Sequence, residues 1–267
     1  MPNKPYEKSA LFIEDHLSII DKTGTEVDFT LNAMQRQFVA DATGKDIILK
    51  GRQMGFSSFI LGAFTKDFLF KDNSLSVVLA DIASNSEDLL ARVKHYIRSY
   101  EEKNKTKVPL KYNSKYELQN AYNNARYIIG TAENTEFGRS KTITNLHMSE
   151  AAFYKHFRKL HASAGTALTP TGRFVIETTA NGFGEFKEFW DESVQGVTGF
   201  TPHFYTSHGF YPPEFIESER KRLGRLFDQE HPSSAEIAFI TSGELYFDVD
   251  ALRSLLEHTK EPINAQN

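Results

Sequence analysis

The sequence predicts an α/β fold in which a mainly parallel central sheet is flanked by helices. Three observations lead to this prediction. Apolar segments of strand length alternate with helical stretches between residues 46 and 194. The 267 residues are enough for one large domain, or for a domain with a smaller appendage. The shares of hydrophobic and charged residues, 40% and 25%, are those of an ordinary globular protein.

The first elements follow from their composition. Residues 46–50 (DIILK) have the apolar, β-branched centre of a strand, and residues 75–80 (LSVVLA) have the continuous apolar run of a strand buried on both faces. Between them, residues 57–70 follow a glycine-bearing turn and have the length and composition of a helix. A further long helix is expected from Ser84, with Glu87 three residues on completing a capping box.

The elements that follow repeat the alternation. A hairpin is expected where two short strands flank the turn-forming Tyr-Asn-Asn at residues 122–124. The segments expected to be regular are strands 116–119, 126–130, 143–148 and 173–178, a helical region from Glu150, and a helix over 183–194.

The character of the sequence changes near residues 196–202. Four prolines, at positions 202, 212, 213 and 232, break the chain into short pieces, and helices are expected only over residues 213–223 and 233–239. We therefore predict a core of residues 1–198 that includes an N-terminal extension, followed by a small linker or lid subdomain of residues 199–267.

Composition narrows the classes of protein further. The chain has no cysteine, which excludes disulfides and thiolate metal sites. Apolar runs such as residues 59–64 are far shorter than the roughly 20 residues of a membrane span, and no signal peptide is recognisable. We therefore expect a cytoplasmic protein with no membrane partner. The net charge of −4 gives no sign of nucleic-acid binding, although basic side chains can gather on one face.

The segment with most chemical information is residues 47–58 (IILKGRQMGFSS), which has the order strand, turn, helix. Backbone N–H groups of such a turn, together with the start of the helix, form a cradle for phosphate. Gly55 permits close approach of the backbone, and Ser57 stands where a P-loop hydroxyl binds Mg²⁺. The pattern departs from the standard P-loop, because Phe56 occupies the lysine position and Gly51 lies only four residues before Gly55. Taken alone, the two glycines equally indicate an ordinary tight turn.

Three further segments favour a nucleotide site. Residues 144–150 (TNLHMSE) deliver Glu150 at the carboxyl end of a strand, where it can orient or deprotonate a water, although a Glu that opens a helix is the simpler local interpretation. Residues 176–182 (IETTANG) are another strand that ends in small polar residues suited to sensing a γ-phosphate, or simply in a turn at Asn181. Gln35 precedes the first core strand and can read an adenine edge, or lie on the surface.

Together these segments resemble, in the same order, the motifs of phage terminase large subunits, whose N-terminal domain is an ASCE-type P-loop ATPase. The string LKGRQMGFSS closely resembles the family's deviant Walker A, in which a basic residue at the front of the loop replaces the lysine after the last glycine. LHMSEAAFY resembles its Walker B strand and TTANG its coupling motif, and the resemblance covers residues 10–250. One departure is that Ser149 replaces the aspartate common in Walker B.

The resemblance implies a role for each residue. Lys50 or Arg52 takes the part of the phosphate-binding lysine, and Phe56 merely packs. Glu150 activates water, and Arg139 is a candidate arginine finger for a neighbouring subunit, with a surface arginine as the alternative. The residues expected to contact ATP are Gln35, Lys50, Gly51, Arg52, Gln53, Met54, Gly55, Phe56, Ser57 and Ser58; Mg²⁺ is expected at Ser57 and Glu150, and coupling to movement at Thr178, Thr179 and Asn181.

The resemblance also implies partners. It predicts ATP hydrolysis that drives double-stranded DNA into a procapsid, in a homo-oligomeric ring on the portal protein, with a small terminase subunit, in the host cytoplasm. Basic stretches at residues 155–159 and 220–225 are candidate DNA contacts, or simply solvated helix faces. Because Asp228, Glu230, Asp248 and Asp250 do not make a convincing metal cluster, no nuclease activity is expected. Two alternatives stay open: a helicase-like translocase, and a nucleotide-binding scaffold that does not hydrolyse.

Overall fold

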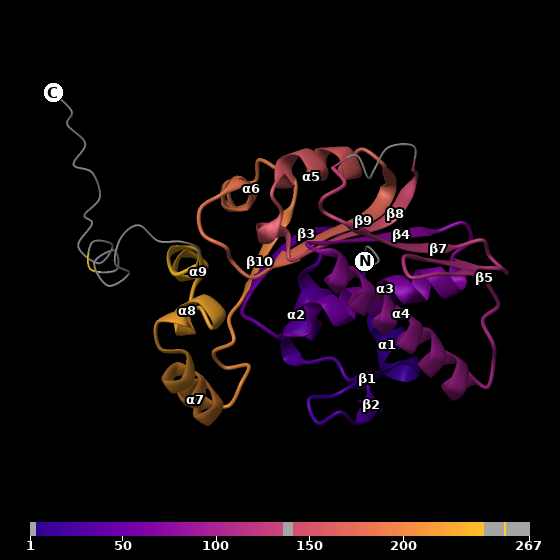
Figure 1. The fold of residues 1–267 in the computed structure, drawn as a ribbon, viewed down its shortest axis with the longest axis horizontal. Helices are drawn as coiled ribbons and strands as arrows, with labels where there is room; N and C mark the ends of the chain where they lie inside the picture. Colours follow the sequence, from indigo (N-terminus) through magenta and orange to yellow (C-terminus); the bar gives the residue numbers. More distant parts are fainter. Residues whose placement is uncertain (1–3, 136–140, 243–253, 255–267) are drawn as a thin grey trace.

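The computed structural model describes residues 4–135, 141–242 and 254, and an eight-stranded sheet runs through them (Figure 1). In spatial order its strands are β10 (Thr201–Tyr205), β3 (Lys45–Lys50), β9 (Leu168–Thr178), β8 (Ile143–Ser149), β4 (Leu75–Ala80), β7 (Arg126–Thr131), β6 (Glu117–Asn120) and β5 (Leu110–Asn113). Neighbours from β10 to β7 are parallel, and β6 and β5 extend the sheet in antiparallel fashion. The predicted mainly parallel sheet is confirmed.

Helices cover both faces of this sheet (Figure 1). One face carries α1 (Glu7–His16), α2 (Ala33–Asp41), α3 (Phe56–Phe70) and α4 (Ala83–Asn104), and the other carries α5 (Phe157–Gly165) and α6 (Glu185–Val194). Two separate hydrophobic cores result. Ile48 belongs to the core beneath α3, whereas its neighbour Ile47 belongs to the core beneath α5 and α6, because successive side chains of a strand point to opposite faces.

Most of the predicted elements are confirmed, with two differences. The helix expected from Ser84 is α4, but the predicted capping box is wrong: the helix begins one residue earlier, at Ala83, and Ile82 occupies the N-cap without any side-chain hydrogen bond. The helical region expected from Glu150 is divided into a short 3₁₀ turn, η1 (Ala151–Phe153), and α5.

Several elements were not predicted. They include α1, α2, the small antiparallel hairpin of β1 (Ser18–Ile20) and β2 (Glu26–Asp28), and the edge strands β5 and β10. The sequences of α1 and α2 do not divide clearly into an apolar and a polar face. Tyr6, Ile13 and Phe38 at these helices are nevertheless fully buried against the rest of the core.

The last described segment packs at the β10 edge of the sheet, where α7 (Pro213–Leu223), η2 (Gly224–Leu226), α8 (Phe227–Glu230) and α9 (Ala235–Ile240) form an orange-to-yellow group (Figure 1). The boundary proposed at residue 199 falls before β10, which pairs with β3 inside the sheet. The helical group therefore begins beyond β10. Among the helices that the structure describes, none has the length and apolar character needed to cross a bilayer.

Candidate functional site

The loop between β3 and α3 has the backbone shape of a tight phosphate-binding turn. Gln53 and Gly55 are both in the left-handed region, with φ of 58° and 78°, and Gly55 is the N-cap of α3. A Cβ atom at Gly55 would lie 3.0 Å from Gln35 Nε2, so the position requires glycine for both its backbone conformation and its close approach.

Two polar side chains at the start of α2 form hydrogen bonds with the backbone of this loop. Gln35 Nε2 donates to the carbonyl of Gly55 at 2.8 Å, and Asn32 Nδ2 donates to the carbonyl of Met54 at 3.1 Å. Gln35 also completes a capping box with Asn32 and is only 2% exposed. The residue predicted to read adenine therefore lies buried against the loop, where its amide fixes the position of Gly55.

The first two N–H groups of the loop are already used. Gly51 donates to the carbonyl of Tyr205 at 2.9 Å, and Arg52 donates to the carbonyl of Glu230 at 3.0 Å. The first N–H groups of a helix have no partner within the helix, which here concerns the residues that follow Gly55. The N–H groups of the predicted cradle that can face phosphate therefore start after Arg52.

Phe56, at the position of the usual P-loop lysine, is a core residue. Its ring is fully buried, stacks on Tyr205 at a centroid distance of 4.7 Å, and meets Phe38 edge-on at 6.0 Å. Phe56 can therefore contact a nucleotide only through its backbone.

Lys50, the last residue of β3, places its ammonium between two carboxylates. Nζ donates to Glu150 Oε1 at 3.3 Å and lies 3.0 Å from Glu177 Oε2, and the side chain is 5% exposed. Burial by itself lowers the pKa of Lys50, but the charges of Glu177 and Glu150 outweigh that effect and raise it. Lys50 therefore stays positively charged within the fold.

Glu177 is the residue of this site that sequence reasoning missed. It is fully buried on β9, where its Oε1 accepts from Ser57 Oγ at 2.6 Å and from Ser149 Oγ at 2.9 Å. Burial raises the pKa of Glu177, but Lys50 and His147 overcome this and hold the pKa well below its usual range. A lone acid within the apolar run FVIET was the only available signal.

Glu150 has an unusual backbone conformation for a non-glycine residue, with φ of 57°. This conformation turns the chain from β8 into η1, and it places Glu150 Oε2 3.2 Å from the Thr179 nitrogen, whose N–H donates to it. Thr178 Oγ1 lies 3.4 Å from the same oxygen, but its hydroxyl makes a shorter bond of 2.6 Å to the carbonyl of Thr179. Such local strain is typical of positions that place a side chain for function. One carboxylate thus joins Lys50 to the segment predicted to couple hydrolysis to movement.

The coupling segment reaches the C-terminal helices through its other end. Asn181 Nδ2 donates to the carbonyl of Ala152 at 3.3 Å, and the Gly182 N–H donates to Ser242 Oγ, just after α9, at 2.8 Å. Arg52 makes a second link to this region, because its Nη1 lies 2.9 Å from Glu230 Oε2. Unlike Lys50, Arg52 is 65% exposed.

A cavity of about 820 Å³ opens beside the loop. Its lining includes Lys50, Arg52, Ser57 and Glu150 on one side and Arg92 and His95 of α4 on the other. A volume of this order is typical of sites for small molecules and cofactors, so the cavity can accommodate a nucleotide.

Solved structures of phage large terminases share this fold. The ATPase domain of the Thermus phage P74-26 large terminase matches with a TM-score of 0.60 at 15% identity, over 76% of this chain and 93% of that chain. The HK97 bacteriophage large terminase matches with a TM-score of 0.61 at 16% identity, over 88% of this chain and 50% of that one. The large terminase of a thermophilic bacteriophage, in complex with ATP-γ-S, matches with a TM-score of 0.52 at 10% identity, over 69% and 46%.

The chain has the fold of a phage large-terminase ATPase domain. It spans about half the length of the HK97 protein and of the protein solved with ATP-γ-S. No protein-family model and no curated protein sequence matches it.

Within this terminase-type fold, the residues around the loop suit a magnesium–nucleotide complex. A hydroxyl at Ser57 with a carboxylate beside it is a donor set for Mg²⁺, which takes its other ligands from phosphates and water. In residues 4–135, 141–242 and 254, no three His, Asp or Glu side chains gather to hold a metal by themselves.

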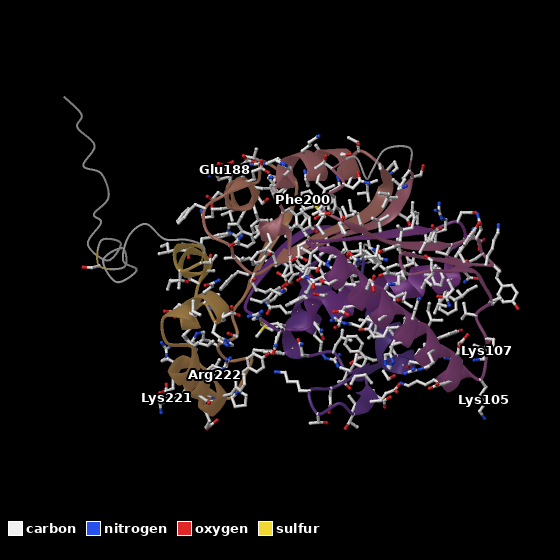
Figure 2. All side chains as sticks on the ribbon, viewed as in Figure 1. Lys105, Lys107, Glu188, Phe200, Lys221 and Arg222 are labelled. Carbon is white, nitrogen blue, oxygen red and sulfur yellow. The ribbon has the colours of Figure 1, made fainter. Side chains whose placement is uncertain are left out.

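The remaining predicted residues lie apart from the loop or cannot be placed. Arg139, Asp248 and Asp250 lie outside the described residues. The two basic stretches lie on different sides of the terminase-type fold, one on α5 and the other on α7, where Figure 2 shows Lys221 and Arg222. Parts of both are neutralised within the chain.

The neutralising pairs are short. Arg158 binds Glu192 through two bonds of 2.8 Å, and Arg222 Nε donates to Glu219 at 2.8 Å.

Proposed function

We propose that this chain is the ATPase of a DNA-packaging terminase, and that it hydrolyses ATP with Mg²⁺ to move double-stranded viral DNA into a procapsid. The observation that carries the proposal is the bond between Lys50 and Glu150 beside the β3–α3 loop. It joins the basic residue of a deviant P-loop, at the end of β3, to an acid directly after the carboxyl end of β8. Ligands of open α/β folds bind at the carboxyl ends of the strands.

Positioning and charge stabilisation account for most of the catalysis of phosphoryl transfer. The N–H groups at the start of α3 face the phosphates in this proposal, and Ser57 supplies the metal-side hydroxyl. Glu150 holds the attacking water, since its carboxylate is already oriented by Lys50 and by the N–H of Thr179. Bound Mg²⁺ neutralises the charge that develops on the phosphates.

Lys50 and Arg52 have different parts in this proposal. Lys50 is buried and fixed between two acids, so it is the residue that stays beside the phosphates through the reaction. Arg52 is exposed and held only by Glu230 of α8, so it can exchange that partner for a phosphate. The exchange would change the contact between the loop and the C-terminal helices.

The partners belong to the same proposal. Double-stranded DNA, the portal protein and the small terminase subunit are the expected partners, and the working form is a homo-oligomeric ring in the host cytoplasm, with no membrane involved. Arg139 is proposed to act on the nucleotide of a neighbouring subunit. No nuclease activity is proposed for these 267 residues.

The test is ATP hydrolysis by the purified chain with Mg²⁺, with and without linear double-stranded DNA, beside Glu150→Gln. We expect turnover in the wild type, its loss in the variant, and nucleotide binding in both. Failure of the wild-type chain to bind ATP would overturn the proposal. Turnover stimulated by single-stranded rather than double-stranded DNA would favour the helicase-like alternative, and binding without hydrolysis in a ring with Arg139 intact would favour the scaffold.

A further inference from the structure

Strand β8 ends at Ser149, directly before Glu150, whereas the resemblance leads one to expect an aspartate before the glutamate. In P-loop NTPases that aspartate acts with the loop Ser or Thr to hold Mg²⁺. A serine hydroxyl carries no negative charge, so Ser149 cannot supply the carboxylate. The metal site therefore lacks this carboxylate unless another residue supplies it.

The neighbouring strand places a carboxylate at the same level of the sheet. Ser149 of β8 pairs directly with Glu177 of β9 in the parallel ladder. Paired residues of parallel strands point to the same face, here the face covered by α3. The two side chains therefore stand side by side, and Ser149 Oγ donates to Glu177 Oε1 at 2.9 Å.

Glu177 also reaches the P-loop hydroxyl. Ser57 Oγ donates to the same Oε1 atom at 2.6 Å, although 120 residues separate the two in sequence. We infer that Glu177 supplies from β9 the metal-positioning carboxylate that β8 lacks, fixing the Ser57 hydroxyl and the water shell of the nucleotide-bound Mg²⁺. This inference rests on the proposed function.

A simpler role, that of counter-ion to Lys50, explains the position of only one of the two carboxylate oxygens of Glu177. Glu177 Oε2 lies 3.0 Å from Lys50 Nζ but makes no hydrogen bond, and it is buried. Oε1 faces Ser57 and Ser149 instead. A counter-ion would not need to hold the hydroxyl of the P-loop.

The local charge balance favours a cation as well. Two carboxylates, of Glu150 and Glu177, share the ammonium of Lys50, and the imidazole of His147 lies 3.4 Å from Glu177 Oε1; with that imidazole neutral, the loop carries an excess negative charge. Arg52 does not offset that excess, because Glu230 holds its guanidinium. A bound nucleotide adds negative charge beside Lys50, so the demand for a second positive charge near Glu177 becomes larger.

The experiment measures how the metal binds, independently of turnover. Binding of Mn²⁺ to the ADP-loaded chain is followed by electron paramagnetic resonance, and ADP affinity without metal is followed by fluorescence of a labelled ADP. For Glu177→Gln we expect Mn²⁺ affinity to fall by about 10- to 100-fold, the usual cost of losing a group that orients a metal ligand. ADP affinity without metal should not weaken, because Lys50 gains freedom to meet the phosphates.

Two variants make the result specific. Ser149→Asp combined with Glu177→Ser moves the carboxylate back to β8, and it should restore Mn²⁺ affinity to within a few fold of the wild type. Asp46→Asn removes another fully buried carboxylate from β3, one bound to the N–H of Gly44 at 2.8 Å and to His203 at 2.9 Å, and should leave Mn²⁺ affinity unchanged.

The outcomes separate this inference from the proposed function. Wild-type Mn²⁺ affinity in Glu177→Gln overturns the inference alone and leaves Glu177 as the counter-ion of Lys50. If Glu177→Gln does not fold, the double variant decides, and weak Mn²⁺ binding by a folded double variant overturns the inference. A wild-type chain that binds no ADP overturns both.

Discussion

Glu150 Oε1 accepts a hydrogen bond from Lys50 Nζ at 3.3 Å, across 100 residues of sequence. The other oxygen of Glu150 accepts from the N–H of Thr179 at 3.2 Å, so the carboxylate is fixed on two sides before any ligand binds. A preoriented acid of this kind is what a water-activating residue requires. The same contacts offer a route by which the state of the nucleotide can reach β9.

Replacement of Glu150 by Gln is expected to reduce ATP turnover by about 10²- to 10⁴-fold, the usual contribution of a positioned general base. The amide keeps the shape of the side chain but cannot take a proton. ADP affinity should stay within a few fold of the wild type, as measured by fluorescence titration. Equal losses of turnover and of affinity would place Glu150 in nucleotide binding instead.

Lys50→Ala and Arg52→Ala should differ strongly in stability. Removal of Lys50 leaves the buried Glu177 without its cation, which costs about 3–5 kcal/mol of unfolding free energy. Removal of the exposed Arg52 breaks only a surface pair worth up to about 1 kcal/mol. Urea unfolding of both variants beside the wild type provides the measurement.

Nucleotide titration of the same two variants then ranks the two basic residues. A larger loss of ADP affinity in Lys50→Ala would support Lys50 as the main phosphate-binding residue. The opposite order would assign that part to Arg52 and leave Lys50 as a structural partner of the two acids.

A pH-dependent stability is expected from His161 of α5. Its ring packs on Phe174, Phe189 and Phe200, its Nε2 is buried without a partner, and burial, with a smaller effect of Arg158, lowers its pKa to about 4. Between pH 6.5 and 4 the unfolded chain therefore binds more protons at this residue than the folded chain does. The contribution of His161 to the free energy of unfolding is therefore complete above pH 6.5, and it declines by about 3 kcal/mol as the pH falls to 4.

Chemical denaturation between pH 4 and 7 checks this, with His161→Phe as the control. The variant keeps an aromatic ring in the cluster but has no proton to bind there. Its stability should decline less steeply than that of the wild type as the pH falls. Parallel curves would show that His161 keeps an ordinary pKa in the folded protein.

Strand alternation and strand ends could be predicted because they depend on local composition. Residues 46–50 and 75–80 are apolar enough to be buried wherever they lie in the sheet, and β3 and β4 confirm both. Glu150 was expected at the carboxyl end of a strand, where ligands bind in open α/β sheets, and that inference needed no knowledge of strand order. The part given to Lys50 came from the family resemblance, and the structure brings the two side chains together.

Glu177 and Gln35 could not be assigned, because their roles depend on register and packing. Only the pairing of Ser149 with Glu177 shows that the acid faces α3 and Ser57. The pattern FVIET alone does not indicate to which face of the sheet the side chain of Glu177 points. Gln35 lies within a sequence typical of an exposed helix start, and only the approach of Gly55 buries its amide.

Phe56→Lys would restore the lysine of the standard P-loop, yet it is expected to destabilise the protein. The side chain at this position is fully buried, stacked on Tyr205 at 4.7 Å and edge-on to Phe38 at 6.0 Å. An ammonium there loses its hydration without gaining a carboxylate, and the ring contacts are lost as well. We expect a cost of at least about 3 kcal/mol of unfolding free energy and no gain in ADP affinity.

Phe56→Leu is the matched control, since it stays apolar and should cost less. Thermal and urea unfolding of the two variants give the comparison, and ADP titration at a temperature where both are folded gives the second readout. A stable Phe56→Lys chain with tighter ADP binding would mean that the ring can leave the core and that the standard lysine position is still usable. The expected result instead means that burial of Phe56 against β10 commits this loop to the basic residues at its front, Lys50 and Arg52.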